Sequence, residues 1–195
     1  MGPAGLHLMT PAAREAVATA DVLVGGKRHL QQFPDFTGDR FALGANIAEF
    51  LSWVTAHQDK HVVVLASGDP LFYGIGTRIV AHFGIGQVRI IPGISAVQYL
   101  CAQSGIDMND MWLTSSHGRS VCFDELARHN KVGMVTDALC GPREIAQQLI
   151  TRGKGHRWMV IGENLAMENE RIHVLPVSEI NADYDMNAVV ILDER

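Results

Sequence analysis

Short apolar runs that alternate with helical patterns constrain the fold of this chain more than any other feature. The runs DVLVGG (21–26), VVVLA (62–66) and VRIIPG (88–93) are mainly apolar and β-branched. Such runs are typical of strands that are covered on both faces. Helical patterns separate them, over residues 11–20, 44–57, 70–84 and 94–105. The alternation predicts parallel strands joined by right-handed helical crossovers.

The second half of the chain follows a different order. Beyond Asn109, strand patterns cover residues 112–115 and 131–137, and a helical pattern begins at Pro142 and ends at Gly153. Three strand patterns with short links follow, RWMVIGEN, RIHVLPV and NAVVILDE. Consecutive strands without intervening helices pair in antiparallel fashion. We therefore expect an α/β protein with a parallel-sheet N-terminal domain over residues 1–110 and a mixed-sheet C-terminal domain over residues 111–195.

The stretch VVVLASGDPLFYGIG (62–76) links one of these strands to its helix. Asp69 suits the N-cap of that helix, and Pro70 suits its first position. Gly74 and Gly76 then fall inside the helix, where each glycine costs roughly 1 kcal/mol relative to alanine. We infer that the backbone passes close to another group at these two positions.

Composition and charge narrow the class of protein. The chain has 195 residues, a net charge of −5 and no apolar stretch of the length that a membrane span requires. Negative charge argues against nucleic acid as the main partner. The first residues lack the order of a signal peptide, and Cys101, Cys122 and Cys140 show no CxxC spacing. We expect a cytoplasmic protein with reduced thiols and without a membrane or nucleic-acid partner.

Ligands of an open parallel sheet bind beyond the carboxyl ends of its strands. Three such ends are rich in small or polar residues, at 67–70 (SGDP), 92–95 (PGIS) and 115–119 (SSHGR). Each offers backbone N–H groups to an anionic ligand. Two basic segments, 27–29 (KRH) and 117–119 (HGR), could supply counter-charges. Asp69 and Ser95 can each be a helix cap or a ligand contact, and both interpretations stay open.

Several other motifs are absent or incomplete. Ile79 stands where the third glycine of a dinucleotide-binding G-x-G-x-x-G loop belongs. The P-loop and the G-x-S-x-G elbow of hydrolases do not occur. His57 and His61 have the spacing of a helical metal pair, but no cluster of carboxylates or thiols completes a site, so we expect no metal.

Taken together, the polar loops resemble those of the tetrapyrrole methylase family, whose members transfer methyl groups from S-adenosylmethionine. The similar segments run in order along nearly the whole chain: GPAGLHLMT, ADVLVGGKRHL, LASGDPLFYGIG, IPGISAVQ, SSHGR, VTD with GP, GENL and NAVVIL. GGKRHL and SSHGR resemble the branch that methylates carbon C5 of a corrinoid precursor in cobalamin biosynthesis. The resemblance implies the family fold, a cofactor between two domains and a homodimer.

The resemblance also assigns roles to individual residues. For S-adenosylmethionine it implies Gly68, Asp69, Pro70, Phe72, Tyr73, Ser95, Ala96, Thr136, Asp137, Glu163, Asn164 and Leu165. For the carboxylate-rich corrinoid we expect contacts from Lys27, Arg28, His29, Ser116, His117 and Arg119, with His117 as a proton acceptor. Ala96 stands where many relatives carry a second serine. Relatives begin with an apolar strand before the Gly-Pro-Ala-Gly segment at residues 2–5, so we expect the N-terminal domain to lack that strand.

Alternative functions remain open from the sequence. The substrate could be another tetrapyrrole such as precorrin-6Y or uroporphyrinogen, or rRNA, although net negative charge disfavours RNA. The chain could be a nicotinamide oxidoreductase. It could also be a non-catalytic subunit that docks onto a C15-methylating, decarboxylating partner.

Overall fold

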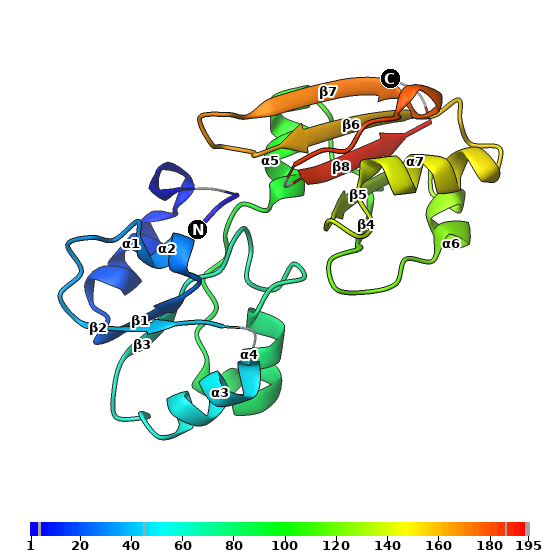
Figure 1. Ribbon diagram of the computed structural model, residues 1–195. Coiled ribbons are helices and arrows are strands. Elements are labelled where there is room, and N and C mark those ends of the chain that lie inside the picture. The colour runs from blue at the N-terminus through cyan, green and yellow to red at the C-terminus, as the bar shows by residue number, and fades with distance from the viewer. Residues whose placement is uncertain (4, 45, 186, 194–195) are drawn as a thin grey trace. The chain divides into compact units, whose positions relative to one another are not determined.

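The computed structural model describes residues 1–3, 5–44, 46–185 and 187–193 of the chain. Internal contacts divide the chain into two compact units, Met1–Ser95 and Ala96–Arg195, which are described separately (Figure 1). Ala4, part of the N-terminal Gly-Pro-Ala-Gly segment, lies outside the described residues. No described helix has the length and apolar character needed to cross a membrane.

The first unit contains a three-stranded parallel sheet with the order β2-β1-β3. Its strands are β1 (Val22–Gly25), β2 (Asp39–Ala42) and β3 (Val62–Val64). The central strand β1 is fully buried, as its apolar sequence predicts. The helices are α1 (Pro11–Ala18), α2 (Lys27–Leu30), α3 (Ile47–Thr55) and α4 (Gly76–Phe83), with short 3-10 turns at Leu6–Leu8 and Ile85–Gln87.

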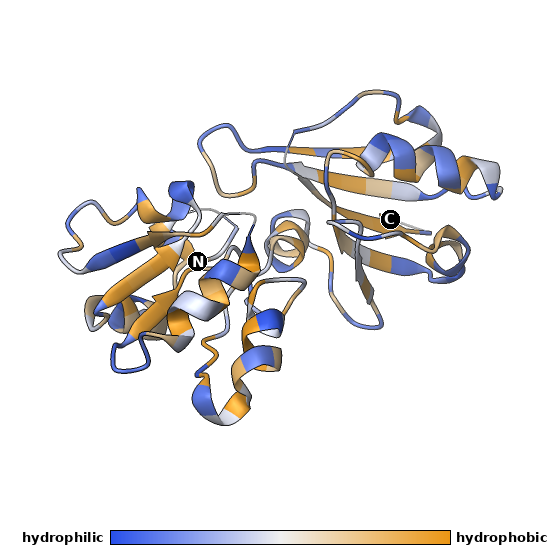
Figure 2. Cartoon of the chain, turned by 60° about the horizontal axis from the view of Figure 1, so that its bottom comes forward, coloured by the Kyte–Doolittle hydropathy of each residue, from blue (hydrophilic) through white to orange (hydrophobic). Residues whose placement is uncertain are grey.

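Capping residues fix the ends of several helices. The hydroxyl of Thr10 accepts the Ala13 N–H at 3.3 Å, and Pro11 takes the first position of α1, as the sequence predicts. Asn46 caps α3 in the same way, through the Glu49 N–H at 3.2 Å. Most of the strand segments are coloured as hydrophobic in Figure 2, and β1, β5 (Lys131–Val135) and β6 (Trp158–Glu163) are mainly buried, so each sheet is the centre of a core.

Two expectations about the first unit were wrong. The helix after β3 begins at Gly76, so Asp69 is not its N-cap and Pro70 is not its first residue. Residues 88–93 form no strand, so β3 lies at the edge of the described sheet. Its three residues are half-buried, so β3 is not the strand covered on both faces that the sequence predicted. Local sequence cannot reveal either difference, because both depend on contacts with distant residues.

A cavity of about 930 Å³ lies within the first unit. Residues of β3, α4 and the irregular segment 88–91 line it together with residues of α1 and α3. Residues 62–64 of β3 are only half-buried beside it, although their sequence is entirely valine. The first unit is thus less tightly packed along β3 than along β1.

The second unit contains a five-stranded mixed sheet with the order β4-β5-β8-β6-β7. Its strands are β4 (Trp112–Ser115), β5 (Lys131–Val135), β6 (Trp158–Glu163), β7 (Arg171–Pro176) and β8 (Asn187–Leu192). β4 and β5 are parallel, whereas β8 pairs antiparallel with both β5 and β6, and β7 pairs antiparallel with β6. The helices are α5 (Ala96–Ser104), α6 (Phe123–Arg128) and α7 (Pro142–Thr151), with a 3-10 turn at Val177–Glu179. The predicted mixed sheet is therefore confirmed.

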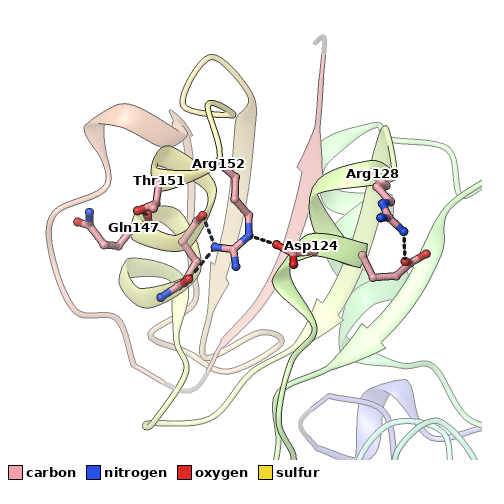
Figure 3. A network of polar contacts seen from close by, with 7 residues as sticks. Asp124, Arg128, Gln147, Thr151 and Arg152 are labelled. Carbon is pink, nitrogen blue, oxygen red and sulfur yellow. Dashed lines mark hydrogen bonds and ion pairs between the residues drawn. The ribbon is translucent and has the colours of Figure 1, made fainter.

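Helices α6 and α7 are joined by a surface network of polar contacts (Figure 3). The Arg152 guanidinium donates to Asp124 Oδ1 at 2.7 Å and also to the side chain and main chain of Gln148. Beneath them, apolar residues of α6, α7 and the sheet form one core that includes Leu126, Ile145 and Leu149, each fully buried. Apolar packing holds this unit together, and the network lies outside it.

The division between the two units falls at Ser95 and Ala96, earlier than the boundary near residue 110 that the sequence suggested. Helix α5 packs against β8, β5 and β6, so it belongs with the second sheet. Val97, Leu100 and Cys101 are buried on its inner face. In the sequence, this helix directly follows the strand pattern at residues 88–93, which suggested that it belongs to the first domain. Its packing places it with the sheet of the second unit.

Candidate functional site

The loop after β3 carries the Gly-Asp-Pro segment, and a carboxylate fixes its shape. Asp69 Oδ1 accepts the Leu71 N–H at 2.8 Å, and Oδ2 accepts the Gly93 N–H at 3.2 Å. Gly68, with a φ of 60°, donates its N–H to the carbonyl of Gly2 at 2.9 Å. Asp69 therefore joins two of the three loops that the sequence predicts as ligand sites, those at 67–70 and 92–95.

The glycines of these loops lie at points of close backbone approach. A Cβ on Gly74 or Gly76 would lie 2.6 or 2.7 Å from the carbonyl oxygen of Pro70. The Gly76 N–H donates to that same oxygen at 3.0 Å. This confirms the close approach inferred from the sequence, and the neighbouring group is the chain's own loop. A Cβ on Gly93 would lie only 2.3 Å from the carbonyl oxygen of Gly68.

The basic segment at residues 27–29 lies beside this loop. It forms the short helix α2 directly after β1, and the parallel pairing of β1 with β3 brings their carboxyl ends to one edge. His29 Nε2 and Ser67 Oγ are 2.9 Å apart. Burial, followed by the positive charge of Arg28, lowers the pKa of His29 below its usual value. The structure thus brings the predicted cofactor loop and a predicted substrate segment together.

An aromatic pair follows Asp69 and Pro70. The rings of Phe72 and Tyr73 contact each other edge to face, with centroids 5.1 Å apart. Tyr73 has a φ of 54°, which is unusual for an aromatic residue, and its side chain is exposed. An exposed ring beside polar backbone groups can pack against a flat ligand. Ser95, the last residue of this unit, is buried.

One edge of the second sheet collects the remaining predicted residues. β4 and β5 run parallel, and β6 runs in the same direction because both β5 and β6 are antiparallel to β8. The three strands therefore end on the same edge of the sheet. The loop at 115–119, the pair Thr136 and Asp137, and the segment 163–165 follow these ends. Helix α5 begins with Ala96, whose side chain is half-buried.

Backbone hydrogen bonds occupy the carboxylate of Asp137. Its Oδ2 accepts the Gly118 N–H at 2.9 Å, and its Oδ1 accepts the N–H groups of Leu139 and Cys140, each at 3.0 Å. The bond from Gly118 is the largest influence that holds the pKa of Asp137 below its usual value. Asp137 therefore joins the loop after β4 to the turn after β5.

Glu163 is the most buried acidic residue among the predicted positions, with 4% of its surface exposed. Its Oε1 accepts the Asp185 N–H at 2.9 Å, and its Oε2 lies 2.7 Å from His173 Nε2 and 3.3 Å from Arg171 Nε. Burial acts to raise the pKa of Glu163, but these hydrogen bonds and charges outweigh it and lower the pKa.

The residues around Glu163 were missed by sequence reasoning. Arg171 and His173 come from β7, opposite Glu163 and Ile161 in the β6–β7 register. The signal that could have revealed them is the short link between the strand patterns RWMVIGEN and RIHVLPV, because a hairpin there pairs residues 163 and 171. Asn164 has a φ of 49°, and the Leu165 side chain packs over Gly162, where a Cβ would meet it at 2.6 Å.

The structure therefore gathers the predicted residues into two groups. The first unit contains residues 27–29, 67–73 and 92–95, and the second contains residues 115–119, 136–137 and 163–165. A single cofactor site that uses both groups stays a prediction. Among the described residues, no group of three or more His, Cys, Asp or Glu side chains is arranged to hold a metal ion.

Comparison with known proteins identifies the class. Residues 1–181 match the model of the tetrapyrrole (corrin/porphyrin) methylases, and the chain belongs to this family. It is 78% identical over 195 residues to the cobalt-precorrin-7 C(5)-methyltransferase of Salmonella typhimurium, with 100% of this chain and 97% of that protein covered. The predicted resemblance is therefore confirmed.

Two more distant relatives extend the comparison. The chain is 29% identical over 175 residues to the decarboxylating precorrin-6Y C(5,15)-methyltransferase of a Sinorhizobium species, which covers 88% of this chain but only 42% of that protein. The uroporphyrin-III C-methyl transferase of Thermus thermophilus, complexed with S-adenosylhomocysteine, has the same fold, with a TM-score of 0.79 at 20% identity. That similarity covers 98% of this chain and 94% of the other.

Proposed function

We propose that this chain transfers a methyl group from S-adenosylmethionine to carbon C5 of cobalt-precorrin-7 in cobalamin biosynthesis. The observation that carries the proposal is the 78% identity, over the whole chain, to a protein with that activity. The two groups of loops fit such a reaction. The loops of the first unit carry main-chain polar groups and the aromatic pair Phe72 and Tyr73, and those of the second unit present His117 and Arg119 on the surface.

The residues of the first unit suit S-adenosylmethionine in their chemistry. The ligand has a carboxylate, an amine, hydroxyl groups and an adenine ring. Asp69 can accept a further hydrogen bond, since a carboxylate offers about four acceptor sites and backbone N–H groups fill two of them. Gly68, Pro70, Phe72 and Tyr73 would border the ligand, with Ser95. From the second unit, Ala96, Thr136, Glu163, Asn164 and Leu165 complete the proposed set.

When bound, the sulfonium supplies an already activated methyl group, so the S–CH3 bond breaks as the bond to C5 forms. The chain's task is to align the two partners and exclude water. No protein nucleophile is needed. Lys27, Arg28, His29 and Arg119 would bind carboxylates of the corrinoid. The expected contact from Ser116 is not part of this set, because Ser116 is buried and its hydroxyl donates to the Cys140 carbonyl. His117, exposed on its loop, would accept the proton that the methylated macrocycle releases.

Calorimetric titration with S-adenosylhomocysteine tests the cofactor part of the proposal. We expect saturable binding to the wild-type chain and its loss in Asp69→Ala. Asp59→Ala is the matched control, because Asp59 is an exposed aspartate of the same unit, outside the two loops that Asp69 joins. Absence of binding to the wild-type chain would contradict the proposal and would favour a non-catalytic subunit.

The assembly and location belong to the same proposal. We propose a homodimer, which the family resemblance supports and which light scattering of the purified chain can test. Cys101, Cys122 and Cys140 are unpaired among the described residues, in keeping with a cytoplasmic location. Co-purification would detect a C15-methylating, decarboxylating partner.

A further inference from the structure

The loop after β4 has a hydrogen-bonded backbone and an exposed tip. The Ser116 N–H donates to the Val135 carbonyl at 3.0 Å, which extends the β4–β5 ladder by one residue. Ser115 and Ser116 are buried, whereas His117, Gly118 and Arg119 are exposed. Gly118 has a φ of 64°, a conformation that favours glycine. The chain therefore turns sharply at Gly118, between the exposed basic side chains of His117 and Arg119.

Hydrogen bonds to neighbouring main-chain groups hold this turn. The Ser116 hydroxyl donates to the Cys140 carbonyl at 2.8 Å, the His117 N–H donates to Ser115 Oγ at 3.0 Å, and the Arg119 N–H donates to the Ser116 carbonyl at 3.2 Å. These bonds use main-chain atoms and serine hydroxyls.

Asp137 is the charged group that joins this loop to the next one. Its Oδ2 accepts the N–H of Gly118, the residue at the tip, while its Oδ1 is held by the turn at Leu139 and Cys140. A hydrogen bond to an ionised carboxylate is stronger than one between neutral groups. Without the bond to Asp137, the tip would keep the bonds to Ser115 and Ser116 but lose the one made by Gly118, the residue between the two basic side chains.

We propose that Asp137 is a positioning residue that holds the loop 115–119 in the conformation in which His117 and Arg119 bind carboxylates of the corrinoid. This inference rests on the proposed function, and it assigns Asp137 a role through the substrate loop in place of contact with the cofactor. A loop that is ordered before binding loses less conformational entropy when the substrate arrives. Asp137 therefore acts on substrate affinity and leaves cofactor affinity unchanged.

The variant Asp137→Asn tests this role, because it keeps the shape of the side chain and removes the charge and one acceptor. We expect the KM for cobalt-precorrin-7 to rise about tenfold, as loss of a charge-assisted hydrogen bond predicts. Because His117, the proposed proton acceptor, lies on the same loop, kcat should also fall, whereas the dissociation constant of S-adenosylhomocysteine should change by less than about twofold. Asp124→Asn is the matched control, because Asp124 is an exposed carboxylate of the same unit that pairs with Arg152 away from this loop.

A second pair of variants separates positioning from general destabilisation. In an Arg119→Ala background, Asp137→Asn should raise KM by less than about twofold, since residues that act through one another are not additive. Gly118→Ala strains the same turn without altering Asp137, so it should also raise KM and leave cofactor affinity intact. Amide hydrogen exchange at residue 118 should become faster in Asp137→Asn.

Three results would overturn the inference. Asp137→Asn could weaken S-adenosylhomocysteine binding as much as it raises KM, which would assign Asp137 to the cofactor. The increase in KM caused by Asp137→Asn could be as large in the Arg119→Ala background as in the wild-type chain, so that the two increases multiply. Alternatively, the variant could have an unchanged KM while the wild-type chain methylates the corrinoid. If the wild-type chain transfers no methyl group to cobalt-precorrin-7, the proposed function fails first, and the inference fails with it.

Discussion

The junction of the loops at 67–70 and 92–95 allows a quantitative prediction about Gly93→Ala. The new methyl carbon would lie 2.3 Å from the Gly68 carbonyl oxygen, and carbon and oxygen atoms need about 1 Å more. Neither neighbour is a flexible side chain, so one loop must move. Overpacking of this kind costs about 1–3 kcal/mol. The movement also lengthens the bond from the Gly93 N–H to Asp69 Oδ2, which is already 3.2 Å.

A full charge-assisted hydrogen bond contributes about 1.5–3 kcal/mol, and the longer bond to Asp69 loses part of it. Together with the overpacking cost, the free energy of unfolding should fall by about 2–4 kcal/mol. For a chain of 195 residues that unfolds in one step, each kcal/mol lowers Tm by about 2–4 °C, so Tm should fall by about 4–16 °C. Scanning calorimetry measures this change, and titration with S-adenosylhomocysteine should show weaker binding. Gly86→Ala is the control, because a Cβ there meets nothing within 4 Å and the backbone is not left-handed. Equal Tm and equal affinity in the two variants would refute the reasoning.

The remaining predictions concern ligand contacts, pH and local stability. Arg119→Ala should weaken corrinoid binding and leave S-adenosylhomocysteine affinity unchanged in calorimetry, and a loss of cofactor binding instead would count against the assigned roles. The pKa of Glu163 is lowered in the folded chain, so its contribution to stability is present above its unfolded pKa and is lost as pH falls through the folded value. Tm of Glu163→Gln should therefore be lower than wild type at neutral pH and should converge with it in acid, and a constant difference across that range would contradict the pKa assignment. Amide hydrogen exchange should be faster in β3, which borders the cavity, than in the buried β6, and equal protection in the two strands would contradict the looser packing of β3.

The sequence predicts elements well where one local pattern determines them. β1 is a short apolar run, α1 has Thr10 and Pro11 at its start, and the three consecutive strand patterns of the second half form β6, β7 and β8. β2 was missed because its sequence, DRFA, is short and begins with two charged residues. Residues 70–75 were expected to be helical, but Asp69 bonds to Gly93 and Pro70 to Gly76, and these contacts favour a loop.

Site prediction met a similar limit. The sequence indicates which loops carry polar residues, because those loops follow apolar runs. It cannot indicate that Asp137 accepts a bond from Gly118, since that contact depends on the parallel pairing of β4 and β5. The contact between Glu163 and His173 likewise requires the β6–β7 register. Residue types were therefore predictable, whereas the partner of each carboxylate required the strand order.

The most direct test of the proposed function is methyl transfer itself. Purified chain is incubated with cobalt-precorrin-7 and S-adenosylmethionine labelled with carbon-13 in its methyl group, and NMR then locates the label in the corrinoid product. We predict one labelled methyl group on C5, formed by the wild-type chain and not by Asp69→Ala. Label at another carbon, or an unlabelled corrinoid from a wild-type chain that is folded, would contradict the proposed function.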